Sequence, residues 1–315
     1  PSNDEMRRLC PDVPDIEDLL RTPEHVISLR TNEMHLVPPS GKPLRYSFEG
    51  LVLNRVAHDE ELVELARSRG VEYLVGTRVT EINSSTVTLA DGSQYSAQII
   101  IGAGGHNDPL RKSHWDVDSL NIPVKFVLVD GIFDDALELH FGSVAPGGYA
   151  WVFPKQGGAN IGLGIQRNLA KGRSLNLYSE EFFSRYQGEV IFSGAGSLPM
   201  SGTIPKFVKG NHLLVGDAAG MVLPSNGAGI TIAMIGGRIA GQVVAEHLRD
   251  ETPLEEYETR WKKQMGKVMR NSKFAFKLGA LMFRSPDWLL NLMFNRLTKP
   301  FIWRAVTCRS LFSLR

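Results

Sequence analysis

One stretch, LLVGDAAGMVLPSNGAGI at residues 213–230, constrains the fold more than any other part of the chain. Its first three residues predict a buried strand that ends on Gly216 and Asp217, and residues 226–229 open an apolar segment with helical spacing. A carboxylate at the carboxyl end of a strand fits the rule for ligand sites in open α/β sheets. The alternative is a plain strand–turn–helix crossover in which Asp217 is the N-cap.

Two properties of this stretch indicate what kind of ligand it would hold. Small residues around Asp217 let a large ligand approach the backbone closely, and the carboxylate can accept hydrogen bonds from sugar or ribityl hydroxyls. The long helix that begins near Gly227, predicted to end near residue 248, presents free N–H groups and a positive dipole end. Such an end would stabilise an anionic, electron-rich ring.

Composition excludes several classes of protein. The chain has 315 residues, 43% of them hydrophobic and 22% charged, which is enough for one or two globular domains. The formal net charge of +1 gives no overall field for nucleic acid, so we expect no nucleic-acid partner. No apolar run reaches the roughly 18 residues of a membrane span. Cys10 and Cys308 have neither disulfide nor metal-ligand spacing, so we predict no metal site and a cytoplasmic location. Cys10 is followed by Pro11 and Asp12 rather than by glycine, and we assign it no role.

Positive charge is concentrated at the end of the chain. Residues 272–315 contain eight basic residues and a single acidic residue, Asp287, and they are rich in Phe, Leu, Met and Trp. One interpretation is a helical surface that lies on an anionic membrane, at its inner face. The other is a C-terminal helical subdomain packed on the body, with solvated basic side chains.

The remaining pattern mixes helices with hairpins. A hairpin is predicted over 25–53 with its turn at 38–41, and a helix from His58 to Arg69. The residues predicted on the buried side of that helix are Leu62, Val63, Leu65 and Ala66. Further strands are expected at 71–75, 77–83, 86–90, 94–97, 98–101 and 212–216, with several more within 121–165. Helices are expected at 178–187 and over most of 254–315. This order predicts an α/β fold with a second, mainly antiparallel sheet.

A second motif carries large aromatic side chains. In GGYAWVFPKQGGANIGLGI, residues 147–165, the residues Tyr149, Trp151 and Phe153 alternate and therefore point to one face of a strand. Three aromatics on one face, with Pro154 ending the run, can line an apolar pocket. The alternative is that they fill a core between two sheets.

Two further motifs carry weaker signals. Arg55 stands just before a predicted helix, from where a guanidinium can reach a pyrophosphate. The segment IIIGAGG at 99–105 does not complete a GxGxxG dinucleotide motif, because position 107 is Asn107. We therefore expect a tight turn at this point.

Together these motifs resemble the geranylgeranyl reductase family, which belongs to the para-hydroxybenzoate hydroxylase-like group of flavoproteins. The resemblance rests on GDAAG with PxxGxGI inside 213–230, YxWxFPK at 149–155 followed by Gly162, and RxxxD at 55–59. It covers roughly residues 45–248. The aromatic motif is the part specific to this family, whereas the GD motif is shared with the wider flavoprotein group.

The resemblance implies an FAD site and a prenyl-chain pocket. Asp217 matches the residue that binds the ribityl chain, residues 224–230 match the segment beside the isoalloxazine ring, and Arg55 matches the arginine near the pyrophosphate. The implied cofactor-binding residues are Arg55, Gly216, Asp217, Ala218, Pro224, Gly227, Ala228, Gly229 and Ile230. The implied substrate-binding residues, which form the wall of the pocket, are Tyr149, Trp151, Phe153 and Pro154.

The resemblance also implies a domain organisation. Residues 49–112 and 206–248 form a discontinuous, Rossmann-like FAD-binding domain, residues 20–48 and 113–205 a substrate domain built on an antiparallel sheet, and residues 249–315 a helical region. Relative to the family, Gly104 replaces an Asp and Asp108 a Ser in the GADGxxSxxR motif that here ends at Arg111. The family's opening βαβ segment with GxGxxG, about 30–40 residues long, is expected to be absent.

The implied function is FAD-dependent reduction of C=C double bonds in geranylgeranyl or polyprenyl lipids by a monomeric enzyme. Electrons would come from NAD(P)H or a small carrier protein, and the sequence identifies no proton donor. One alternative is an FAD-dependent monooxygenase of the same fold group. The other is a truncated or non-catalytic lipid-binding protein without flavin.

Overall fold

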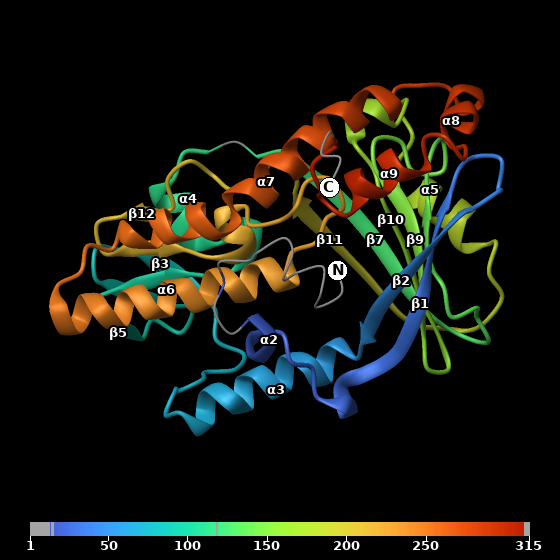
Figure 1. Ribbon diagram of the computed structural model, residues 1–315. Helices are drawn as coiled ribbons and strands as arrows, with labels where there is room; N and C mark the ends of the chain where they lie inside the picture. The colour runs from blue at the N-terminus through green and yellow to red at the C-terminus, as the bar shows by residue number, and fades with distance from the viewer. Residues whose placement is uncertain (1–12, 14–15, 118, 312–315) are drawn as a thin grey trace.

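The computed structural model describes residues 13, 16–117 and 119–311, so Cys10 lies outside the described part of the chain. The predicted α/β class is confirmed: a large, mainly antiparallel sheet stands beside a layered α/β region, with two smaller sheets and a helical C-terminal part (Figure 1). The first described elements are the short helix α2 (Ile16–Leu19) and the 3-10 turn η1 (Glu24–Val26).

The large sheet has seven strands in the order β11-β7-β10-β9-β8-β1-β2. Their bounds are β1 (Ile27–Val37), β2 (Leu44–Leu53), β7 (Asn121–Asp130), β8 (Leu137–His140), β9 (Tyr149–Lys155), β10 (Gly158–Gly164) and β11 (Val190–Pro199). Only β1 and β8 pair in parallel; all other neighbours in this sheet are antiparallel. The β1–β2 hairpin confirms the prediction made for residues 25–53.

The two faces of this sheet bury different side chains because neighbours along a strand point in opposite directions. On one face, Ala150 and Val152 of β9 pack with Phe182 of α5 (Leu175–Phe183). On the other face lies the aromatic row of β9, covered by α8 (Asp287–Met293) and α9 (Lys299–Val306). Trp303 of α9 stacks on Tyr46 of β2 at 4.5 Å between ring centroids, which fastens the C-terminal helices to the hairpin.

The second part of the molecule is built on a three-stranded sheet. Strand β13 (His212–Leu214) pairs in parallel with β6 (Ile100–Gly102) and antiparallel with β12 (Val208–Lys209). Helices α4 (Pro109–His114), α6 (Ile230–Asp250) and α7 (Glu256–Met282) belong to this part, and the three sheet strands share one hydrophobic core with α6 and α7. Figure 1 shows α6 and α7 running side by side from this part, with α7 continuing to the large sheet.

The remaining described elements include a small antiparallel sheet and the helix that precedes it. The predicted meander is confirmed as β3 (Val79–Ile82), β4 (Thr86–Leu89) and β5 (Gln94–Ser96). Helix α3 (Arg55–Ser68) precedes it and begins three residues before the prediction, because the Asn54 side chain accepts a hydrogen bond from the Ala57 N–H. The other described elements are the short 3-10 turns η2 (Gly105–Asn107), η3 (Arg167–Leu169) and η4 (Gly216–Ala219).

Three local predictions were wrong. Residues 71–75 form no strand, and their apolar side chains are exposed; β propensity produces a strand only where a neighbour pairs with the backbone. Leu62 and Leu65 of α3 are exposed, because no described element covers that side of the helix. The helix predicted at 178–187 lies at 175–183, since Ser174 caps it by accepting from the Leu177 N–H.

Strand β11 was not predicted. Its sequence, VIFSGAGSLP, carries two glycines and two serines, which have low strand propensity. Pairing with β7 along almost its full length overrides that propensity.

Gly162 of β10 shows how the aromatic row is accommodated. It pairs directly with Trp151 of β9, and a Cβ at this position would stand 2.2 Å from Cζ2 of the indole. The indole therefore lies across the glycine, and its Nε1 donates to the Asn160 side chain at 2.7 Å.

We predict that Gly162→Ala lowers the free energy of unfolding by about 1–3 kcal/mol, because the added methyl group must displace the indole. Chemical denaturation followed by circular dichroism measures this change. The matched control is Gly241→Ala on the exposed side of α6, where no heavy atom lies within 4 Å of the added Cβ. That variant should be more stable by about 0.5–1 kcal/mol, since alanine favours helix. Equal effects of the two substitutions would contradict the packing described for Trp151.

Candidate functional site

The loop between β13 and α6 brings Asp217 to the beginning of a long helix. After β13, the turn η4 ends at Gly220 in the left-handed region (φ +70°), and the Met221 N–H donates to the Gly216 carbonyl at 2.9 Å. The chain then returns through 221–229 to α6. A Cβ added at Gly229, the N-cap of α6, would lie 3.4 Å from Oδ1 of Asp217. The predicted site residues 216–218 and 227–230 are thus adjacent in space.

Asp217 is not the N-cap that the alternative explanation required, because Gly229 occupies that position and provides no side-chain cap. Among the described residues, no side chain or backbone group donates a hydrogen bond to the Asp217 carboxylate. Burial raises the pKa of this carboxyl group, and the nearby charge of His106 partly opposes the shift. A half-buried acceptor and an uncapped helix start therefore lie together, as a ligand with hydroxyls and an electron-rich ring would need.

Arg111 and Asp108 form hydrogen bonds that hold this turn and the neighbouring Gly104 in place. Arg111 is buried, and its Nη1 donates to the carbonyl oxygens of Asp217 and Ala218, both at 3.3 Å. Asp108 caps α4 by accepting from the Arg111 N–H at 3.0 Å, and it also accepts from the Gly104 N–H at 2.7 Å. Gly104 fits here because an added Cβ would stand 2.8 Å from the Asp108 carboxylate. The two departures from the family motif, at 104 and 108, are therefore coupled.

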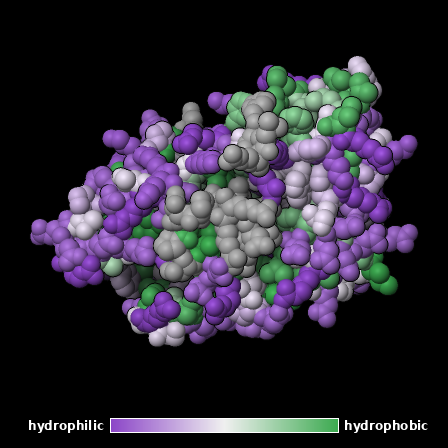
Figure 2. All heavy atoms as spheres, viewed as in Figure 1, coloured by the Kyte–Doolittle hydropathy of each residue, from purple (hydrophilic) through white to green (hydrophobic). Residues whose placement is uncertain are grey.

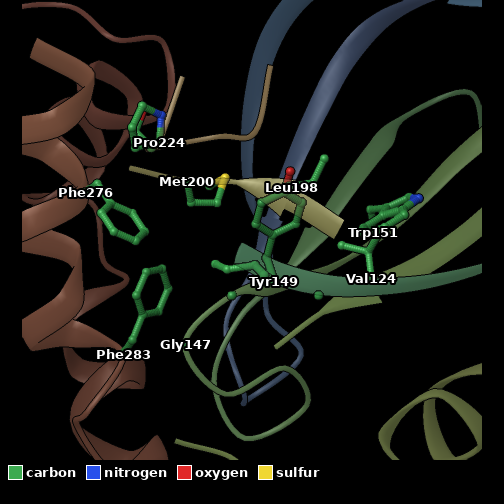
Figure 3. Close-up of a pocket in the computed structure, with 13 residues that line it drawn as sticks. Val124, Gly147, Tyr149, Trp151, Leu198, Met200, Pro224, Phe276 and Phe283 are labelled. Atoms are coloured by element: carbon green, nitrogen blue, oxygen red, sulfur yellow. The ribbon is translucent and has the colours of Figure 1, made fainter. Parts of the chain in front are cut away.

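Tyr149 and Trp151 line a small apolar cavity of about 30 Å³ between the large sheet, the loop and α7. In Figure 3, Phe276 and Phe283 approach from the helical side and face Tyr149 across the cavity. The lining residues are Ile122, Val124, Gly147, Gly148, Tyr149, Trp151, Gly164, Leu198, Met200, Pro224, Ser225, Phe276 and Phe283. The cavity combines the aromatic strand with Pro224 of the loop.

A hydrogen bond joins the aromatic strand to the glycine-rich loop. The Tyr149 hydroxyl donates to the Asn226 carbonyl at 2.6 Å, and a Cβ at Gly227 would lie 3.2 Å from that hydroxyl oxygen. Burial raises the pKa of Tyr149 to about 12, so the phenol keeps its proton, and hence this bond, at neutral pH. The loop predicted to lie beside the flavin ring and the wall predicted to hold the substrate therefore meet directly.

Asn226 is a residue to which the sequence analysis gave no role. Its Oδ1 accepts from the Ala228 N–H at 2.9 Å, and its Nδ2 donates to the Val306 carbonyl at 2.8 Å. Ser225 Oγ next to it lies 3.1 Å from the Cys308 sulfur. The loop is thus tied to the C-terminal end of α9. The signal in the sequence was local only, an Asn–Gly pair typical of a turn.

Other predicted residues lie away from this junction. Phe153 packs on Trp151, with ring centroids 6.2 Å apart, and is not part of the cavity lining. Pro154 alternates with the aromatic row and shares the opposite face with Ala150 and Val152. Arg55 is in the first turn of α3, where its Nη2 donates to both Asp59 carboxylate oxygens at 3.1 Å.

Phe276 of α7 and Phe283, the C-cap residue of α7, were missed as pocket residues. Their spacing of seven places them on one face of a helix, and they belong to the basic, aromatic tail whose role the composition left open. The structure supports the packed interpretation for this face of the tail. Among the described residues, no helix combines the length and apolarity that a membrane span requires.

Comparisons with known proteins define the class of the fold. A solved geranylgeranyl bacteriochlorophyll reductase-like protein from Thermoplasma acidophilum matches with a TM-score of 0.78 at 23% identity, over 95% of this chain and 82% of that one. A probable FAD-dependent monooxygenase from Pseudomonas aeruginosa matches with a TM-score of 0.61 at 17% identity, over 86% and 83%. The fold is therefore shared with FAD-dependent oxidoreductases.

Sequence comparisons identify the family within that class. Residues 120–196, which include β7–β10 and the aromatic strand, match the model of the geranylgeranyl reductase catalytic domain. Digeranylgeranylglycerophospholipid reductases are 34% identical in Methanococcoides burtonii (75% of this chain, 65% of that one) and 30% identical in Methanopyrus kandleri (85% and 74%). The chain belongs to the geranylgeranyl reductase family. It spans about two thirds of the length of these curated relatives.

The raised pKa of Asp217 predicts a pH-dependent stability. At neutral pH the carboxylate is ionised in both the folded and the unfolded chain. In the folded chain, burial disfavours the ionised form and so lowers the stability of the fold. This penalty disappears as the pH falls through the folded pKa and below the unfolded value of about 3.9. Asp217→Asn should therefore unfold at a higher temperature than the unmodified chain at pH 7, and the difference should vanish below about pH 4.

Thermal unfolding followed by circular dichroism across this pH range measures the difference. Asp91→Asn is a control of opposite sign, because hydrogen bonds from Ser93 lower the pKa of Asp91. These hydrogen bonds stabilise the folded chain above the pKa that Asp91 has in the unfolded chain. The stabilisation is lost as the pH falls through the lower pKa of Asp91 in the folded chain. An unchanged melting temperature for Asp217→Asn at pH 7 would contradict the penalty.

Proposed function

We propose that this chain acts as an FAD-dependent reductase of C=C double bonds in the geranylgeranyl chains of lipids. The observation that carries the proposal is the hydrogen bond from Tyr149 to Asn226, because it places the apolar cavity directly against the loop with Asp217. The related reductases named for digeranylgeranylglycerophospholipids support the substrate class. The monooxygenase alternative is supported by fold likeness alone.

The residues present fit the ring and ribityl part of FAD. The Asp217 carboxylate would accept hydrogen bonds from the ribityl hydroxyls, and the open start of α6 would face the ring. For the pyrophosphate we keep Arg55, which would then share its guanidinium between Asp59 and the cofactor. Reduced FAD, when bound, supplies a hydride to the double bond, and a proton completes the saturation.

The residues around the cavity orient the substrate and exclude water. An isolated double bond is unactivated, so alignment and exclusion of water must supply much of the rate. A volume of about 30 Å³ holds roughly one or two water molecules, so a prenyl chain can enter only where side chains move. Phe276 and Phe283 face β9 across the cavity, and the flexible side chain of Met200 also lines it, so we propose that these side chains move when substrate enters.

The remaining partners follow from the lipid substrate. We propose that a monomer takes its substrate at the inner face of the cytoplasmic membrane. Electrons would come from NAD(P)H or a small carrier protein. The described residues provide no specific motif for binding NAD(P)H or a carrier protein.

Flavin binding provides the first test. The purified chain is incubated with FAD, desalted and examined for visible absorbance, and then titrated with FAD and with riboflavin. Because the proposed contacts involve the ring and ribityl part, which both ligands share, Asp217→Ala should weaken both ligands about tenfold or more. Asp91→Asn, on an exposed turn, is the control and should bind like the unmodified chain. Full retention of both ligands by Asp217→Ala would contradict the assigned role.

Turnover provides the second test. The flavin is reduced chemically without oxygen, a digeranylgeranyl glycerophospholipid is supplied in detergent, and mass spectrometry follows the addition of hydrogen. Trp151→Ala should lower the rate by about tenfold to a hundredfold through misalignment, while flavin binding persists. The rate of Trp151→Phe should lie between the rates of the unmodified chain and of Trp151→Ala. Insertion of oxygen into the lipid under aerobic conditions would instead support the monooxygenase.

A further inference from the structure

Three C-terminal segments expose large apolar side chains on the side away from the body. On α7, Leu278 and Leu281 are 46% and 66% exposed. On α8, Trp288 and Leu292 are 68% and 66% exposed, one turn apart. Leu297, in the connection to α9, is 87% exposed. Figure 2 shows hydrophobic side chains gathered over α8 and the adjoining end of α7.

The same helices are apolar on their inner side as well. Leu290 of α8 is buried, and Phe294 just after α8 packs in one hydrophobic cluster with residues of the large sheet. Phe276 of α7 and Phe283, the C-cap residue of α7, line the cavity. Packing on the body therefore accounts for one apolar face of these helices and leaves the other in contact with solvent. We call the outer face the apical surface: Leu278, Leu281, Trp288, Leu292, Leu297 and Phe301.

The segments that carry the apical surface also expose basic side chains. Lys277, Arg284 and Arg296 are exposed and form no ion pair with any described residue. The single acidic residue of this region, Asp287, is already engaged, because it accepts hydrogen bonds from the Ser143 N–H at 3.0 Å and from the Ser143 hydroxyl at 2.6 Å. The surface thus combines exposed apolar area with positive charge.

We infer that the apical surface docks on an anionic lipid bilayer. Apolar side chains would enter the boundary between headgroups and acyl chains, and the basic residues would meet anionic headgroups. A second copy of the chain is a poorer occupant, since a two-fold interface would bring the same positive residues together. The inference rests on the proposed function for the role of docking. Docking in this way would place the bilayer on one side of α7 and the substrate cavity on the other.

Co-sedimentation with vesicles tests this inference without flavin or turnover. The full 315-residue chain is mixed with vesicles of phosphatidylcholine alone or with added phosphatidylglycerol. Binding to the anionic vesicles should be stronger and should weaken as salt rises. Arg284→Glu combined with Arg296→Glu should reduce the anionic preference by roughly tenfold or more. Trp288→Ser combined with Leu292→Ser should reduce binding to both kinds of vesicle.

Matched controls lie elsewhere on the surface. Ile132→Ser removes a fully exposed apolar side chain between β7 and β8, and Arg69→Glu reverses an exposed charge at the end of α3. Both should bind vesicles like the unmodified chain. Equal loss in the controls, or vesicle binding that survives both double substitutions, would overturn the inference. So would a dimer in solution that dissociates on Trp288→Ser with Leu292→Ser.

Two activity measurements separate this inference from the proposed function. With substrate in detergent, the apical variants should reduce the lipid at the unmodified rate, because they leave the cavity unchanged. With substrate in anionic vesicles, their rate should fall in parallel with binding. If no lipid is reduced in either form while vesicle binding follows the pattern above, the proposed function fails and the docking surface remains.

Discussion

The hydrogen bond between Tyr149 and the Asn226 carbonyl is the contact on which the rest of the site depends. It joins a strand of the large sheet to the loop that leads into α6, which lie almost 80 residues apart in the sequence. Because the phenol is buried and its pKa is about 12, the bond persists at neutral pH. One polar contact therefore fixes the wall of the apolar cavity relative to the carboxylate of Asp217.

The loop is held from two further directions. Arg111 binds the carbonyls of the Asp217 turn, and Asn226 binds the end of α9. Within the part of the chain that the structure describes, the Asp217 carboxylate receives no hydrogen bond and no side chain caps the start of α6. A site of this kind is less stable than it could be, because a buried carboxylate without donors is disfavoured until a ligand supplies them.

Sequence patterns predicted the parts of the fold that depend on local spacing. The alternation of Tyr149, Trp151 and Phe153 placed them on one face, and the hairpin, the meander and the long helix α6 occur where expected. The strand predicted at 71–75 failed, and β11 was missed, because strand formation depends on a partner more than on propensity. Asn226, Phe276 and Phe283 carried no motif, so only spatial neighbours reveal their place in the site.

The family, the α/β class and the two motifs could be predicted from the sequence, since they depend on residue type and on periods of two or about 3.6 along the chain. Tertiary contacts were needed to show that the two motifs share a cavity, that Pro154 faces away from it, and that the Asp108 carboxylate fills the space beside Gly104. The structure also shows that the C-terminal helices bury some of their apolar side chains on the body and leave others exposed. A helix has more than one face, and composition does not record which of them the body covers.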